Sequence, residues 1–188
     1  MQIKLQALLN GATEVRERFG DGGLERVLSA CSPAVRDRCE TGIAIEWHPR
    51  REFDEFLDVS ERLLGRGDGG LARAIGARGA YLNTRGWVTR ALLFVLNPKW
   101  VLEKAASTFH QFNDTGELTL PEFRDGHCRM ELRGIPDPNA LFCETFSGWA
   151  EVMGERIGFG RVRVEHTKCR ARGDRTCSWD VDWQPKDV

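Results

Sequence analysis

The chain has 188 residues, a formal net charge of -1, 41% hydrophobic residues and 29% charged residues, a mixture that suits one globular domain. Acidic and basic residues are interleaved, so the composition gives no reason to expect binding to nucleic acid or to an anionic membrane. The longest apolar run, residues 91–96, is far below the roughly 20 residues that a membrane-spanning helix needs. The first ten residues also lack a signal-peptide pattern. We therefore expect a cytoplasmic protein without a membrane span, in which free thiols or metal ligands are favoured over disulfides.

The first part of the chain is predicted to be helical. A helix over 12–20 ends at a Gly-Asp-Gly-Gly sequence, a typical helix stop, and a second short helix follows. Ser32 and Pro33 are typical of the N-cap and first position of the next helix. Residues 42–49 form a short extended piece that ends at a proline. Residues 51–65 then place phenylalanine and leucine on one helical face.

Three further helices are expected before the pattern changes. Residues 67–83 carry small and apolar residues at helical spacing, and their glycines predict a close contact with a neighbouring helix. Residues 86–96 and 98–112 are predicted to be two helices divided at Asn97-Pro98, because proline interrupts a helix. Residues 1–115 are therefore expected to be mainly helical.

Residues 116–188 are predicted to form a β-β-α-β-β unit. Apolar and polar residues alternate, as in half-buried strands, over 117–123, 128–134, 161–166 and 177–183. A helix opened by Asp137 and Pro138 lies between the second and third strands, and a Gly-Asp turn signal predicts a hairpin of the last two. The fold class is predicted to be α+β, a helical N-terminal half packed on an antiparallel sheet, with residues 1–188 as a single domain.

Three cysteines and a histidine near the C-terminal hairpin are candidate metal ligands: Cys143, His166, Cys169 and Cys177. Three thiolates and an imidazole suit tetrahedral zinc, and sulfur ligands favour zinc over magnesium or calcium. The alternatives are a simply buried Cys143, a local disulfide between Cys169 and Cys177, or a redox switch of that pair. The remaining cysteines, Cys31, Cys39 and Cys128, are interpreted as core or surface thiols.

The segment VRVEHTKCRARGDRTCSWDVDW resembles the C-terminal segment of the 4-vinyl-reductase domain family. That family includes sensor domains of aromatic-responsive transcription activators, and its fold is distantly similar to transport-protein-particle subunits and haem nitric-oxide-binding domains. In the aromatic sensors, zinc is held by a helix cysteine, an acidic residue 23 positions later, a cysteine three later and another eight later. The four candidate ligands reproduce these intervals, with His166 in place of the acid and Glu165 adjacent to it. The resemblance implies a structural zinc site whose four protein ligands close the coordination shell.

The full chain is also similar to a large paralogous family of myxobacterial proteins. The shared features are the Asn-Pro helix break at 97 and 98, the turn Cys-Arg-Ala-Arg-Gly-Asp, and the segments EWHPRREF, GDGGLARAIGARGA and FCETFSGWAEVMGE. They cover most of the chain. The similarity implies a common fold and a small-molecule-binding ancestry.

In the aromatic sensors the ligand occupies an apolar pocket between helices and sheet. The matching region here supplies candidate ligand-binding residues, each of which has a plain core position as its alternative: Phe94, Trp100, Phe109, Phe112, Phe123 and Met153. The helix at 86–96 contains no histidine to bind a phenol hydroxyl. Haem sensors use a proximal histidine and a Tyr-Ser-Arg motif, and the surroundings of Tyr81, the single tyrosine, do not match that motif.

No catalytic motif is present, so we do not expect an enzyme. The predicted function is a cytoplasmic small-molecule-binding or sensory module with structural zinc, whose output passes through a protein partner. The alternative is an interaction or scaffold protein that works as a homodimer through the apolar helices around 86–112. A reductase activity rests only on the name of the family that the chain resembles.

Overall fold

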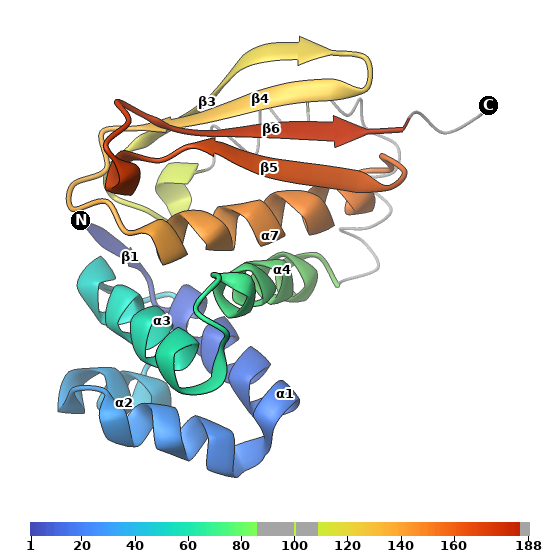
Figure 1. Cartoon of the computed structure of the whole chain (residues 1–188). Helices are drawn as coiled ribbons and strands as arrows, with labels where there is room; N and C mark the ends of the chain where they lie inside the picture. Colours follow the sequence, from blue (N-terminus) through green and yellow to red (C-terminus); the bar gives the residue numbers. More distant parts are fainter. Residues whose placement is uncertain (86–99, 101–108, 185–188) are drawn as a thin grey trace.

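The computed structural model describes residues 1–85, Trp100 and residues 109–184. The helices predicted over 86–96 and 98–112 therefore lie mostly outside the described residues, as does Phe94. A four-stranded antiparallel sheet packs one face against helix α7, and the remaining labelled helices lie beyond α7 (Figure 1). This arrangement confirms the predicted α+β class.

The labelled helices are α1 (Gln6–Ala30), α2 (Pro33–Thr41), α3 (Arg50–Leu64), α4 (Gly70–Thr84) and α7 (Ala140–Arg156). Helix α1 continues beyond its predicted end, but its backbone breaks at Gly20, where φ is 73° and only glycine is free of strain. The glycine signal therefore predicted the break correctly, and the second short helix expected after it forms the rest of α1. No helix among the described residues is long and apolar enough to cross a bilayer.

Two sheets are present in the described part of the chain. The larger contains β3 (Glu117–Arg124), β4 (His127–Arg133), β5 (Val162–Lys168) and β6 (Cys177–Trp183), in the order β3-β4-β6-β5. The predicted hairpin of the last two strands is present, and β6 also pairs with β4. The smaller sheet joins β1 (Gln2–Lys4) to β2 (Trp47–Pro49). Strand β1 was not predicted, because three residues are too few to show an alternating pattern.

Strand alternation decides which side chains face α7. On the central strand β6, the buried inward set is Cys177, Trp179, Val181 and Trp183. The register places Leu132 of β4 opposite Cys177 and His166 of β5 opposite Trp179. The outward set is polar and includes an ion pair of Arg129 with Asp180 at 2.7 Å. The core therefore lies between this sheet and the helices.

Helix α7 begins at Ala140, three residues after the predicted start. The side chain of Asn139 caps it by accepting a hydrogen bond from the backbone N–H of Phe142 at 3.0 Å. Asp137 instead has a positive φ of 47° in the preceding turn. Asn139 is the better cap because its side chain reaches a free N–H of the first helical turn.

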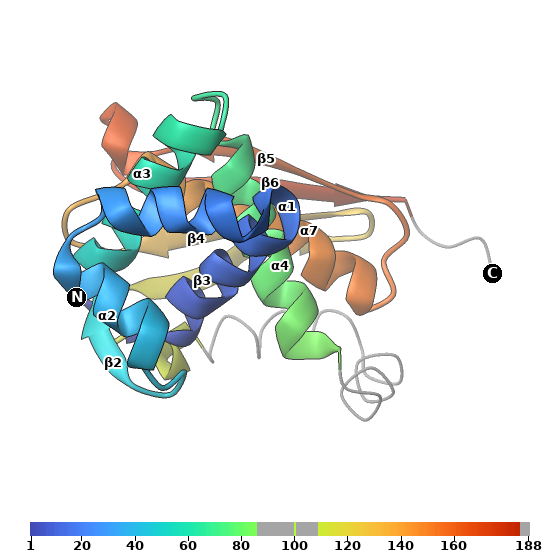
Figure 2. The ribbon, with the colours of Figure 1, turned by 90° about the horizontal axis from the view of Figure 1, so that it is seen from below.

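Helices α4 and α7 cross in direct backbone contact. A Cβ atom on Gly76 of α4 would lie 1.8 Å from the carbonyl oxygen of Thr145, and one on Gly148 of α7 would lie 1.8 Å from that of Arg73. The close helix contact predicted from the glycines of 67–83 is therefore present. The crossing is seen from below in Figure 2.

Candidate functional site

The four predicted metal ligands come together at one end of the sheet. Each offers one ligand atom, and these atoms all lie within 4.8 Å of one another. Cys143 comes from the first turn of α7, and the other three come from β5, β6 and the turn between them. A tetrahedron of zinc–sulfur bonds of about 2.3 Å has edges of roughly 3.8 Å, so the cluster needs little adjustment to hold a metal ion.

A β-bulge brings His166 and Cys169 to the same face of the sheet. Regular alternation would put residues three positions apart on opposite faces. Here His166 pairs with Trp179 but Lys168 pairs with Ser178, a register shift of one residue. The extra residue in β5 reverses the alternation of side chains after His166. Cys169 therefore points to the same face as His166, where it is fully buried.

The same alternation separates His166 from its neighbour Glu165. The side chain of His166 is 5% exposed, whereas that of Glu165 is 63% exposed and lies 3.6 Å from Arg163 on the outer face. The imidazole ring stacks on Trp179, with ring centroids 5.0 Å apart. Of the two candidates for the second ligand, the cluster includes His166.

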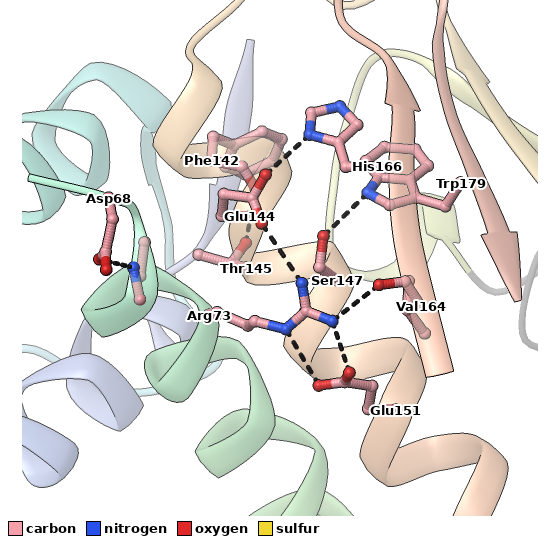
Figure 3. A network of polar contacts seen from close by, with 12 residues as sticks. Asp68, Arg73, Phe142, Glu144, Thr145, Ser147, Glu151, Val164, His166 and Trp179 are labelled. Atoms are coloured by element: carbon pink, nitrogen blue, oxygen red, sulfur yellow. Dashed lines mark hydrogen bonds and ion pairs between the residues drawn. The ribbon is translucent and has the colours of Figure 1, made fainter. Parts of the chain in front are cut away.

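Polar contacts hold the imidazole ring in place (Figure 3). Nδ1 of His166 lies 2.8 Å from a carboxylate oxygen of Glu144, and Arg73 of α4 lies 3.7 Å from the other oxygen. The indole N–H of Trp179 donates to Ser147 at 3.1 Å. The remaining nitrogen of His166, Nε2, is buried without a hydrogen-bond partner. A buried imidazole nitrogen beside three thiols fits the role of a metal ligand.

The three thiols of the cluster are free. The sulfurs of Cys143 and Cys177 are 3.3 Å apart, against about 2.05 Å for a disulfide bond. The hydrogen bond from Cys143 lowers the pKa of Cys177 to about 4, while the same contact and burial raise the pKa of Cys143. Burial also raises the pKa of Cys169. One thiolate is therefore already favoured, and metal binding would have to deprotonate the other two.

A cavity of about 170 Å³ lies between α1, α4, α7 and the single turn η1 (Phe109–Gln111). Its aromatic lining comprises Phe53, Phe109, Phe112, Phe142, Phe146 and Trp149. Side-chain amides line it as well, and Gln6 of α1 donates to Asn83 of α4 at 2.8 Å. Among the described lining residues, Lys4 carries the one charge, and its ammonium donates to the carbonyl of Ile45 at 2.7 Å. The lining is therefore mainly apolar, with neutral amide groups and one ammonium group.

The structure brings only some of the predicted ligand-binding residues to this cavity. Phe109 and Phe112 line it. Phe123 instead packs against Trp183, with ring centroids 5.7 Å apart, and Met153 is buried further along α7. Trp100 is 47% exposed and is not among the lining residues.

The cavity and the cysteine cluster use neighbouring faces of α7, because consecutive helical residues point about 100° apart. Phe142 and Phe146 face the cavity, while Cys143 and Ser147 face the sheet. Trp179 links the two sites, since it stacks on His166 and its ring lies 5.6 Å from that of Phe146. Sequence reasoning missed Phe146 as a lining residue because a helical stripe does not reveal which neighbour each side faces.

Comparison with known proteins places the fold. No protein-family model matches the sequence, and no curated protein matches it. Among solved structures, the chain is similar to an unliganded Fe(II) H-NOX protein from K. algicida, with a TM-score of 0.74, 10% identity and 99% of each chain covered. It is also similar to an H-NOX protein from S. oneidensis in its Fe(II)NO state, with a TM-score of 0.64, 13% identity and coverage of 95% of this chain and 98% of that one.

A third similar structure is an oxygen-binding H-NOX domain related to soluble guanylate cyclases. Its TM-score is 0.65 at 12% identity, with 93% of this chain and 92% of that chain covered. The class of protein is thus an α+β domain with the H-NOX fold. This agrees with the expected similarity in fold to haem nitric-oxide-binding domains, while the resemblance to the 4-vinyl-reductase family and to the myxobacterial paralogues stays a prediction. This particular chain carries a Cys/His cluster at its C-terminal hairpin.

The described residues do not fit haem in the cavity. Protein ligands to haem iron are histidine, cysteine, methionine and tyrosine. The chain has four histidines, six cysteines, three methionines and one tyrosine. All of them lie in the described part of the chain, and none lines the cavity. A drug-sized ligand needs a cavity of roughly 300 Å³ or more. Haem is larger than such a ligand, and the cavity here has about 170 Å³.

Proposed function

We propose that this chain is a small-molecule-binding sensory domain of the 4-vinyl-reductase type, related to the myxobacterial paralogues, with a structural zinc ion. In this proposal residues 1–188 form one cytoplasmic domain, and Cys143, His166, Cys169 and Cys177 hold the zinc. The domain passes its signal to a protein partner. The observation that carries the sensory role is the aromatic cavity between α1, α4 and α7.

The cavity favours an uncharged molecule with a single ring as the ligand. Its volume of about 170 Å³ is close to that of an apolar cavity of about 150 Å³ that binds benzene in another protein. Aromatic side chains provide the contact surface, and Gln6, Asn10 and Asn83 provide amide groups for one polar substituent. A charged ligand would lose its hydration on entering the cavity. Lys4 is the one described lining residue that could offset such a charge.

Thermal shift measurements with toluene, phenol and cyclohexanol test the ligand-binding role. At 100 times its dissociation constant, a ligand stabilises the folded state by about 2.7 kcal/mol. We expect a rise in Tm of roughly 5–11 °C for a chain of this size. The variant Ala7→Leu fills the cavity and should abolish the shift, whereas Ala34→Leu on the exposed face of α2 should retain it. No shift with any probe would count against a single-ring ligand.

An absorption spectrum after incubation with haem tests the alternative that the fold family implies. We expect no Soret band that remains with the protein after gel filtration, because the described cavity lining offers no axial ligand. A stoichiometric band that survives gel filtration would contradict the proposed ligand class. The zinc content, measured on the same sample, is independent of this outcome.

The homodimer alternative depends on the apolar helices around 86–112, most of which lie outside the described residues. Light scattering separates the two proposals. A monomer at high concentration would rule out a scaffold that works as a homodimer.

A further inference from the structure

The proposed zinc site depends on a residue outside the four candidate ligands. Glu144 follows Cys143 on α7, and its carboxylate lies 2.8 Å from Nδ1 of His166. With Nδ1 engaged, the imidazole has one nitrogen left, and Nε2 is buried without a partner. The hydrogen bond that one ring nitrogen makes decides which nitrogen binds a metal.

The carboxylate is itself held in position from a second helix. Arg73 of α4 lies 3.7 Å from Glu144, donates to Glu151 from Nε at 3.1 Å, and donates to the backbone carbonyl of Val164 at 2.8 Å. Figure 3 shows Arg73 at the centre of these contacts, between α4, α7 and β5. Because the guanidinium of α4 contacts two carboxylates of α7 and a carbonyl of β5, it fixes Glu144 relative to the strand that carries His166.

Partial burial strengthens the interaction between Glu144 and Arg73. The side chains of Glu144 and Arg73 are 22% and 32% exposed, so water competes only in part for the carboxylate. The carboxylate lies between Nδ1 of His166 at 2.8 Å and the guanidinium of Arg73 at 3.7 Å. The carboxylate is therefore kept as an acceptor, and Nδ1 of His166 carries the proton that it donates.

We propose that Glu144 is a positioning residue for the metal ion: it fixes the proton on Nδ1 of His166, so that Nε2 points at the three sulfurs as the fourth ligand. This inference rests on the proposed zinc site and assigns to it a residue that does not touch the metal. Carboxylate partners of metal-binding histidines typically contribute 10–100-fold to metal affinity. Arg73 supports the same function by holding the carboxylate.

Competition with a chromophoric zinc chelator tests the proposal. We expect Glu144→Gln to raise the Kd for zinc by about 10–100-fold. Glu165→Gln is the matched control: it removes a carboxylate next to His166 in the sequence, but that carboxylate lies beside Arg163 on the outer face of the sheet. The zinc Kd of this variant should stay within about twofold of the wild-type value, because the free-energy effects of independent sites add to about that precision.

A double-mutant cycle distinguishes positioning from a general loss of packing. In a His166→Ala background, Glu144→Gln should change the zinc Kd by no more than about twofold, because the nitrogen that it positions is gone. The visible bands of the cobalt(II)-substituted protein give a second readout, since they report tetrahedral geometry. Should Glu144→Gln not fold, Glu144→Asp retains the charge but shortens the reach, and it should raise the Kd in the same direction.

The outcomes separate the two proposals. If the wild-type protein does not bind zinc, the metal site itself is overturned. If it binds zinc and both folded Glu144 variants keep the wild-type Kd, the positioning role alone is overturned. An equal rise in Kd for Glu165→Gln, or a full effect of Glu144→Gln in the His166→Ala background, would also overturn it.

Discussion

Replacing Cys143 by serine is expected to release the metal and to destabilise the folded chain by about 4 kcal/mol or more. Structural zinc contributes about 10–16 kcal/mol of binding free energy in small zinc domains, and that energy is linked to folding. Cys143 is the one ligand supplied by α7, while the other three come from the hairpin. Its loss therefore removes the proposed metal-mediated connection between the C-terminal hairpin and the long helix. For a chain of this size, 4 kcal/mol corresponds to a fall in Tm of roughly 8–16 °C.

Elemental analysis and calorimetry of the purified variants measure this effect. We expect one zinc ion per wild-type chain and none in Cys143→Ser. Treatment of the wild-type protein with a strong chelator should lower its Tm to a similar degree. Cys128→Ser is the control, because Cys128 is 1% exposed but lies outside the cluster. This control should keep its zinc and lose only the modest stability that an unsatisfied buried hydroxyl costs, about 1–3 kcal/mol. Equal metal content in both variants would contradict the assignment.

Gly76→Ala is expected to destabilise the protein by at least about 3 kcal/mol, the upper range for overpacking a core. The added Cβ would lie 1.8 Å from the carbonyl oxygen of Thr145 and 2.7 Å from its Cα. These are backbone atoms of α7, so no side-chain rotation relieves the clash and the two helices must separate. The expected fall in Tm is roughly 6–12 °C. Gly148→Ala should have a similar effect, because its Cβ would meet the backbone of Arg73 in the same way.

Gly79→Ala is the matched control, one turn further along α4. The nearest atom to its Cβ would be the amide nitrogen of Asn10 at 3.6 Å, an ordinary contact. Alanine is favoured over glycine in a helix interior by about 0.5–1 kcal/mol, so we expect this variant to be slightly more stable than the wild type. Urea denaturation of the zinc-loaded proteins compares the three variants directly. A fall in stability for Gly79→Ala as large as that for Gly76→Ala would mean that helix propensity, and not the crossing, explains the effect.

Much of the architecture follows from local patterns in the sequence. The alternation in the four longer strands, the helical stripes and the turn at Gly173, whose φ is 98°, predicted an α+β fold with a C-terminal hairpin. The spacing of Cys143, His166, Cys169 and Cys177 predicted a metal cluster whose ligand atoms do come together. Such features can be predicted from the sequence because side-chain periodicity and turn conformation depend on residues a few positions apart.

The tertiary structure decided the features that depend on residues far apart in the chain. The bulge after His166 arises from pairing with β6, and strand alternation through that pairing is what places His166, and not Glu165, at the cluster. Glu144 reaches His166 across 22 positions and Arg73 across 71, through contacts that no local spacing encodes. The cavity is likewise a space left between α1, α4, η1 and α7. Packing geometry determines whether an aromatic stripe becomes solid core or the wall of a pocket, and that geometry exists only once the elements have assembled.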